Sequence, residues 1–568
     1  MSAPATPPQL RLRENQLFLV LTILVGVLAG LSAVLFSVSI EQVSTRLFGL
    51  APSRARLFLI PPIVSVATGI LLAKVFPDAR GSGVPQTESA YHLAGGQIPA
   101  RVPIGKFITG VLCIGSGHSM GREGPSVQIG AGLASTIGRW LQVPPQRVRE
   151  LVPVGAAGAL AAAFNTPVAA VLFALEEIIG DMNASLIGST VVASVASVIV
   201  ERSILGNEPL FHVPPYRLVH PAELIAYAGL GLCGGFVSLL FSKGLLAARR
   251  LFRSLPARSR ILQPAIGGLI IGGLLIVSPA VMGVGYEYVD QALNGGLLLK
   301  TMVLLCFLKL GATIVSYASG NAGGVFAPSL YIGAMAGGAA GMLVHRFAPF
   351  PTADPGAYAL VGMGTLFAGI IRAPMTSVFM IFEITQDYQI LVPLMVANML
   401  SFAISRRFQP VPLYHALLHQ DGIHLPSPAT QAPAAARTAR DLMRTDLVYL
   451  DPQMPLNLAI QGMTDDRGAA YVVGARDQFI AAVTRQQLER WHGSAPNDRL
   501  ASVVKELPSI HVHPDHPLDI VVDRLSQSDG VLPVVSRTDA HYVEGIVTAD
   551  SILIARDRQR GPGDRVRE

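Results

Sequence analysis

Three glycine-rich segments, each ending in a proline, carry the residue types that could bind an anion. They read Gly81-Ser-Gly-Val-Pro85, Gly121-Arg-Glu-Gly-Pro125 and Gly323-Gly-Val-Phe-Ala-Pro328. Each proline stands where a helix can begin, because its missing N–H would have no acceptor there, and glycine lets the backbone approach a ligand closely. A helix N-terminus offers free N–H groups and about half a positive charge. Three such ends aimed at one point would hold a dehydrated anion without any Lys or Arg, and weakly enough to release it.

A purely structural interpretation of these segments stays open at this point. Glycine is common in membrane helices, so each break could be a re-entrant bend or a site of helix packing. The recurrence of the same pattern in three segments favours the anion site.

The acidic residue inside the second segment adds proton chemistry. Glu123 lies between two glycines in an apolar region, where a carboxylate is costly and is by default a functional hypothesis. Its charged form could occupy an anion site at a helix start, and its protonated form would lose that attraction and swing away. One side chain would then be both gate and proton carrier. The alternative is a salt bridge to Arg122, but adjacent residues rarely face each other.

Apolar helices must position these segments. The chain is 51% hydrophobic and 14% charged, whereas soluble proteins are about one quarter charged. Stretches of about 20 apolar residues, enough to cross a bilayer as a helix, recur before residue 410; the clearest are Gln16–Ile40, Leu57–Phe76, Leu151–Ile179, Leu224–Leu246, Leu262–Ser278 and Met302–Tyr317. The sequence therefore predicts an all-α polytopic membrane domain over residues 16–420, after a cytoplasmic segment over residues 1–15.

The charge distribution predicts the topology. Arg11 and Arg13 precede the first span, and Arg406 and Arg407 follow the last, so the positive-inside rule places both termini in the cytoplasm. The net charge of +6 needs no nucleic acid to explain it, because no basic run is interleaved with aromatic residues. The use of 37 Arg against six Lys indicates a GC-rich bacterial genome and hence the cell (inner) membrane.

Neither a metal site nor an enzyme is indicated. Cys113, Cys233 and Cys306 lie far apart in apolar stretches without CxxC spacing, which predicts packing residues and no disulfide. The sequence contains no nucleophile–base set, metal-ligand spacing or P-loop, so we expect no catalytic cofactor. A membrane-tethered sensor is a further class, and it would need a ligand site in the C-terminal tail.

The membrane region contains an internal repeat. Residues 121–130 align with residues 324–333, and further on Pro167 aligns with Pro374 and Glu176 with Glu383. Two matches in the same order predict homologous halves, at about 16–205 and 220–410. Repeated halves with interrupted apolar segments are typical of transporters with a midplane site. An odd number of crossings in each half would invert them, and parallel repeats stay open.

Residues 16–418 resemble the CLC family of chloride channels and chloride/proton exchangers. The resemblance is carried by the three segments above, by Gly105-Lys106 and by Pro412-Leu-Tyr414. It implies a homodimer in the lipid bilayer, with one anion pathway in each subunit, built from inverted repeats.

The resemblance also implies roles for individual residues. Ser82 would supply a hydroxyl to a central chloride, and Tyr414 a phenol from the cytoplasmic side. The backbone amides of Val325 and Phe326 would complete that central site. Amides from Arg122 to Gly124 would form an outer site for which Glu123 competes. A serine at position 82 is typical of the chloride-selective members.

Glu177 separates two functions that the resemblance allows. Exchangers of the family carry a second, inward-facing glutamate after a Phe-x-x-Glu stretch, and Phe173-Ala-Leu-Glu-Glu177 places Glu177 there. Glu176 has a counterpart in the second half, Glu383, whereas Glu177 aligns with Ile384, so Glu176 is interpreted as structural. We therefore expect a chloride/proton antiporter, with a passive voltage- or pH-gated chloride channel as the alternative. A solvated helix-end carboxylate is the structural interpretation of Glu177.

Other acidic residues of the membrane region match no motif. Glu88, Glu150 and Asp181 are interpreted as loop or helix-end charges.

The C-terminal region resembles a tandem CBS pair, an α/β module. A linker at 421–437 rich in Pro, Ala and Thr precedes the pair at 438–558, and a flexible tail follows at 559–568. The two units are expected at 438–491 and 499–558, each with a pair of strands, at Ala469–Val473 with Phe479–Val483 and at Val531–Val535 with Val543–Val547.

Nucleotide binding by this pair is open to question. CBS pairs often bind adenine nucleotides through a Thr/Ser-x-x-Asp after the last strand. Here Thr484 is followed three residues later by Gln487, and Thr548 by Ser551. We therefore weigh an adenine nucleotide against a dimerising or purely structural role.

Overall fold

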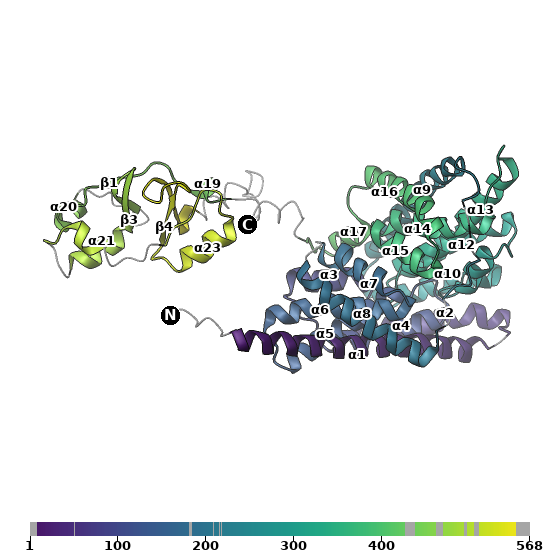
Figure 1. The fold of residues 1–568 in the computed structure, drawn as a ribbon. Helices are drawn as coiled ribbons and strands as arrows, with labels where there is room; N and C mark the ends of the chain where they lie inside the picture. The colour runs from purple at the N-terminus through teal and green to yellow at the C-terminus, as the bar shows by residue number, and fades with distance from the viewer. Residues whose placement is uncertain are drawn as a thin grey trace. The chain divides into compact units, whose positions relative to one another are not determined.

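The computed structural model divides into two compact units, Thr6–Leu425 and Pro426–Glu568 (Figure 1). The residues that it describes are 8–49, 51–180, 184–207, 210–214, 216, 218–425, 438–461, 470–493, 497–504 and 510–551. Three predicted segments lie outside these residues: the linker from 426 to 437, the expected last helix of the CBS pair beyond residue 551, and the tail at 559–568.

The first unit consists of two sets of eight α-helices and a final helix within the described residues. The first set is α1 (Pro8–Phe48), α2 (Arg54–Lys74), α3 (Val84–Leu93), α4 (Arg101–Gly115), α5 (Glu123–Trp140), α6 (Pro145–Phe164), α7 (Pro167–Phe173) and α8 (Ala184–Leu205). The second set is α9 (Glu223–Ser254), α10 (Gln263–Val277), α11 (Tyr286–Leu293), α12 (Leu299–Ala318), α13 (Phe326–Phe347), α14 (Pro355–Ile370), α15 (Pro374–Thr385) and α16 (Leu391–Phe408). The final helix is α17 (Leu413–Gln420).

The packing of these helices repeats between the two sets. Helix α1 packs on α8 as α9 packs on α16, and α5 packs on α6 as α13 packs on α14. Equivalent helices of the two sets also contact each other, α2 with α10 and α7 with α15. The repeat predicted from the sequence is therefore present in the fold, and Figure 1 shows the purple and blue first set beside the teal and green second set.

Glycine pairs permit the closest of these crossings. A Cβ atom on Gly130 of α5 would lie 2.3 Å from the carbonyl oxygen of Gly155 on α6. A Cβ atom on Gly333 of α13 would lie the same 2.3 Å from the oxygen of Gly362 on α14. Small residues let membrane helices approach in this way, and the two halves use the same solution.

Seven helices among the described residues are long and apolar enough to cross a membrane. They are Gln16–Phe48, Arg54–Lys74, Leu186–Leu205, Glu223–Ser254, Leu299–Ala318, Phe326–Phe347 and the stretch Tyr388–Gln420, which includes both α16 and α17. Other apolar helices, α10, α14 and α15, are shorter.

One predicted span is wrong. Leu151–Ile179 is not a single helix, because α6 ends at Phe164 and is capped by Asn165, whose φ of 57° is left-handed. Asn tolerates this conformation better than most residues, and Pro167 then begins α7. A π-helical turn over Ala174–Ile179 follows and ends at Gly180.

The second unit contains two small sheets, as expected for an α/β module. Strand β2 (Ala470–Ala475) lies between the parallel β1 (Tyr449–Leu450) and the antiparallel β3 (Gln478–Thr484). Strand β4 (Val531–Val535) pairs antiparallel with β5 (Val543–Thr548). The helices described here are α19 (Ala439–Leu442), α20 (Leu456–Gln461), α21 (Arg485–His492), α22 (Leu500–Val503) and α23 (Leu518–Ser526). Both predicted strand pairs are present.

The expected division at 438–491 and 499–558 is wrong in one respect. Thr438 and Arg444 form bridges to Pro517 and Ile546, so the first segment of the pair belongs to the second core. Conversely, Leu500 and Val504 pack in the first core, with β2 and β3. Each unit therefore completes its core with a segment that the sequence order assigns to the other.

Candidate anion site

The three glycine–proline segments meet at one place. The N–H of Gly121 donates to the carbonyl of Gly324 at 2.8 Å, and the N–H of Gly324 donates back to Gly121 at 2.8 Å. The N–H of Gly323 donates to the carbonyl of Gly81 at 3.1 Å. These bonds bring together the starts of α3, α5 and α13, as the anion-site interpretation requires.

The junction has no room for larger residues. A Cβ atom on Gly124 would lie 2.5 Å from the Ser82 hydroxyl, and one on Gly83 would lie 2.6 Å from the carbonyl oxygen of Gly124. Gly83 also has a φ of 108°, which L side chains rarely adopt. The glycines therefore allow the helix starts to touch.

Glu123 is the first residue of α5 and is fully buried. Its Oε1 accepts a hydrogen bond from the Tyr286 phenol at 2.6 Å. The N–H of Ala327, in the first turn of α13, interacts with this carboxylate, whose Oε2 has no hydrogen-bond partner among the described residues. The carboxylate thus lies across the start of α13, where the helix dipole favours a negative group.

Arg122 forms no ion pair with the adjacent Glu123. Its guanidinium donates to the carbonyl of Ala163 at 3.4 Å and lies over the Tyr286 ring, 5.7 Å from the centroid. Among the ion pairs of the described residues, none joins Arg122 to Glu123. The salt-bridge alternative is therefore wrong.

Ser82 and Tyr414 place two hydroxyls close to each other in the same region. Both residues are fully buried, and neither hydroxyl has a hydrogen-bond partner among the described residues. The Tyr414 phenol lies beside the Ser82 hydroxyl and within electrostatic range of Glu123, although Tyr414 belongs to α17, far along the chain. Buried hydroxyls without partners are rare and need an explanation, and both could donate to an anion.

Val325 and Phe326 form the start of α13 and are buried. The first N–H groups of any helix have no acceptor within it. The Phe326 ring packs against Phe164, Phe173 and Phe367 at centroid distances of 5.0, 5.7 and 4.3 Å. This aromatic cluster holds the helix start in place.

Two buried lysines fix the loops that lead into the site. Lys106 Nζ donates to the carbonyls of Ala79 at 2.9 Å and Gly81 at 2.6 Å. Lys309, at the equivalent place in the second set, donates in the same manner to the loop before α11. Lys106 has no role in the predicted site, although a comparison of the repeats shows that both halves carry this lysine.

Glu177 lies in the π-helical turn and is 9% exposed. Its carboxylate interacts with the charges of Glu88, Glu176 and Arg372. Tyr414 also lies within electrostatic range of Glu177. The solvated helix-end interpretation of Glu177 is therefore wrong.

Glu88 corrects another expectation. It lies inside α3 and is 4% exposed, so it is no loop or helix-end charge. Its Oε1 is 2.6 Å from His415 Nε2, and the His415 side chain is 32% exposed. Neither residue belonged to the predicted site; the one available signal was that His415 directly follows Tyr414.

Glu176 and Glu383 form reciprocal helix caps. Glu176 accepts hydrogen bonds from the N–H groups of Met375 at 3.1 Å and Thr376 at 2.8 Å, at the start of α15. Glu383 accepts from Val168 at 2.9 Å and Ala169 at 2.7 Å, at the start of α7. The structural role expected for Glu176 agrees with this geometry.

Comparisons with known proteins agree with the architecture. The voltage gated chloride channel family matches residues 63–406, and the CBS domain family matches residues 504–558. The H(+)/Cl(-) exchange transporter ClcA of Vibrio cholerae serotype O1 (strain M66-2) is 32% identical over 420 residues, covering 71% of this chain and 89% of the relative. A ClcB-like chloride channel protein of Ralstonia nicotianae is 32% identical over 437 residues, covering 74% and 97%.

Solved structures show the same fold. A slow cyanobacterial Cl-/H+ antiporter superposes with a TM-score of 0.65 at 28% identity, covering 71% of this chain and 97% of that one. A eukaryotic CLC transporter superposes with a TM-score of 0.60 at 20% identity and covers 94% of this chain and 97% of its own. The chain therefore belongs to the voltage gated chloride channel (CLC) family and joins its helical membrane fold to a C-terminal CBS domain.

Proposed function

We propose that the protein exchanges chloride for protons across the membrane as a coupled antiporter. The observation that carries this proposal is the Glu123 carboxylate, which is buried across the start of α13 beside the unpaired hydroxyls of Ser82 and Tyr414. A carboxylate in this position competes with chloride for the same helix dipole. Relatives named as exchange transporters support the coupling.

Each side chain then has a defined task. Ser82, Tyr414 and the amides of Val325 and Phe326 bind the central chloride. Charged Glu123 occupies the outer site formed by the amides of Arg122 to Gly124. When a proton neutralises the carboxylate, the helix dipole no longer attracts it, so it leaves the site and chloride takes its place.

Glu177 transfers the proton on the cytoplasmic side. It is buried and interacts with Glu88, and Glu88 contacts the partly exposed His415. His415, Glu88 and Glu177 therefore form a series of titratable groups from solvent to the interior. Chloride does not use these titratable groups, so the proton and the anion follow separate routes on the cytoplasmic side. The two routes meet at Glu123.

The cellular setting is proposed on the same basis. We place the protein in the bacterial inner membrane as a homodimer, with one pathway in each subunit and both termini in the cytoplasm. The arginines before the first span and after the last support this orientation.

Purified protein in liposomes tests the proposal. An imposed chloride gradient is expected to drive protons against their own gradient, measured with a pH electrode while a chloride electrode records the anion. Robust chloride flux without proton pumping would instead support a passive channel. The Ralstonia relative is named as a chloride channel protein.

Tyr286→Phe is expected to open the gate more readily. The substitution removes the hydrogen bond to charged Glu123, and a bond to a charged group contributes about 1.5–3 kcal/mol. We expect roughly a tenfold rise in chloride flux at neutral pH. The pH of half-maximal flux should move upward, because a carboxylate that has lost a donor is protonated more readily. Chloride efflux from liposomes between pH 4 and 8 measures both effects.

Tyr331→Phe is the matched control for this prediction. Its phenol donates to the carbonyl of Ala280 at 3.2 Å and has no bond to Glu123. An identical pH profile in the two variants would contradict a specific role for Tyr286.

We propose a structural role for the CBS pair without adenine nucleotide. Gln487 caps α21 through Thr484 and donates to Asp529 at 3.2 Å, and Ser551 is bonded to Thr548. The residues at the usual Asp positions are thus engaged within the protein. Calorimetry of the full-length protein with ATP, ADP and AMP is expected to give no micromolar binding, and a clear micromolar signal would contradict this role.

A further inference from the structure

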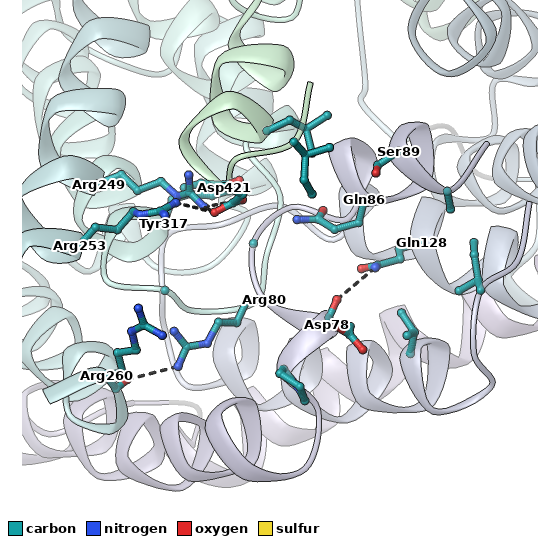
Figure 2. A pocket seen from close by; sticks show the side chains of 18 of the residues that line it. Asp78, Arg80, Gln86, Ser89, Gln128, Arg249, Arg253, Arg260, Tyr317 and Asp421 are labelled. Carbon is teal, nitrogen blue, oxygen red and sulfur yellow. Dashed lines mark hydrogen bonds and ion pairs between the residues drawn. The ribbon is translucent and has the colours of Figure 1, made fainter. Parts of the chain in front are cut away.

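The membrane unit contains a second polar site beside the proposed chloride pathway. A cavity of about 580 Å³ opens between the loop before α3 and the ends of α9 and α17. Four arginines line it, Arg80, Arg249, Arg253 and Arg260, against two aspartates (Figure 2). We call this cavity the arginine pocket.

Two of the four arginines share a single carboxylate, which leaves a net positive charge on the trio. Arg249 donates to both carboxylate oxygens of Asp421 at 2.8 Å, and Arg253 donates to the same carboxylate at 2.6 Å. Figure 2 shows this trio on one wall of the pocket. Asp421 is therefore fully engaged and does not neutralise the opposite wall.

The other two arginines face each other. The Arg80 guanidinium donates to the backbone carbonyl of Arg260 at 3.3 Å, and the two positive charges repel each other. The second aspartate of the pocket, Asp78, is paired with Arg101 at 3.0 Å. Within the described part of the chain, no ion pair joins Arg80 or Arg260 to a carboxylate. Figure 2 shows both side chains in the pocket.

The geometry points to a site for an oxyanion of the phosphate class: we propose that Arg80 and Arg260 bind a phosphate group in the arginine pocket. Two forked guanidinium groups match the paired oxygens of a phosphate better than a spherical chloride. A doubly charged group also balances both arginines at once. A free phosphate and a phosphate monoester on a lipid share this chemistry.

The location gives the bound anion a consequence. Gly81 and Tyr317 line the pocket, and Gly81 directly precedes Ser82. A Cβ atom on Gly81 would lie 3.3 Å from the Tyr317 hydroxyl, so the two residues form one wall. A phosphate on the pocket side of this wall repels chloride arriving at Ser82 and slows the exchange. This consequence rests on the proposed function, whereas binding does not.

Thermal unfolding of the full-length protein in phosphatidylcholine nanodiscs tests the binding. Saturating chloride keeps the central site filled, and gluconate holds the ionic strength constant while inorganic phosphate is titrated. We expect phosphate to raise the Tm of the wild type by a few degrees. The Arg80→Gln/Arg260→Gln double variant and the Arg260→Gln single variant, each compared with its own phosphate-free Tm, should lose that rise. Arg250→Gln, an exposed arginine of α9 outside the pocket, should keep it.

A second set of nanodiscs separates the two sources of phosphate. If phosphatidic acid raises the Tm of the wild type but not of the double variant, and free phosphate leaves the wild-type Tm unchanged, the occupant is a lipid headgroup. That result supports the proposed site. If neither source raises the wild-type Tm, or if the double variant responds like the wild type, the proposal is overturned. Chloride flux in liposomes checks the consequence, because phosphate should slow the wild type and spare the double variant. Failure of the proposed function would appear separately, as absent proton pumping with the phosphate-dependent rise in Tm intact.

Discussion

Glu123→Gln is expected to abolish proton movement while chloride still passes. The amide has nearly the same size as the carboxylic acid but cannot carry a proton, and it has no charge with which to compete for the start of α13. Removing a positioned proton carrier costs roughly 100-fold or more in rate, so chloride-driven proton uptake should fall to the background of empty liposomes. Chloride efflux should become independent of pH, because no titrating group remains at the gate. Simultaneous recordings of pH and chloride from one liposome preparation measure both quantities.

Glu150→Gln is the control for the same chemical change. Glu150 belongs to α6, is paired with Arg147 at 2.8 Å and is partly exposed. It should leave the proton-to-chloride ratio unchanged. If Glu123→Gln still pumped protons at the wild-type ratio, the gate would have to be another residue.

Much of the candidate site could be predicted from the sequence because its backbone signals are local. A glycine-rich segment that ends in a proline is a local signal of a helix start, so the segments at 81–85, 121–125 and 323–328 are recognisable one by one. The repeat then predicted a shared scaffold. In the structure the three segments are joined by backbone hydrogen bonds, which is the simplest way to hold three helix starts at one point.

The contacts that the sequence did not reveal are those between distant side chains. Tyr286 bonds to Glu123 across 163 positions, and His415 contacts Glu88 across 327. Neither pair has a motif, because a phenol or an imidazole in an apolar helix reads as a packing residue. Glu88 was misread for the same reason, since only the position of α17 reveals that it is buried.

The segment exchange in the CBS pair was missed for a different reason. The strand pairs are local hairpin-like units and are visible in the pattern of β-branched residues. The segments at 438–446 and 499–504 are too short to show any periodicity. Which core each segment packs in depends on the space that the other elements leave there, and that space is a property of the folded unit.

Glu177→Gln is expected to stop protons more than chloride. Glu177 is buried beside Glu88, and its carboxylate is the innermost group of the proposed proton series. The amide interrupts that series, so proton flux should fall roughly 100-fold, whereas chloride keeps its hydroxyl and amide ligands. Glu123 would then receive protons from the outside alone, and the gate would still open at low external pH. In liposomes we expect chloride efflux to persist and to rise as the external pH falls, without proton uptake.

Glu176→Gln separates this effect from damage to the fold. Glu176 is the adjacent residue and caps α15 with both carboxylate oxygens. An amide retains one acceptor, so this variant should lower the thermal stability without changing the number of protons moved per chloride. Glu177→Gln should show the reverse, a changed ratio with little change in stability. If both variants altered the ratio alike, the π-helical turn as a whole would control coupling, and Glu177 would lose its assignment as the internal proton carrier.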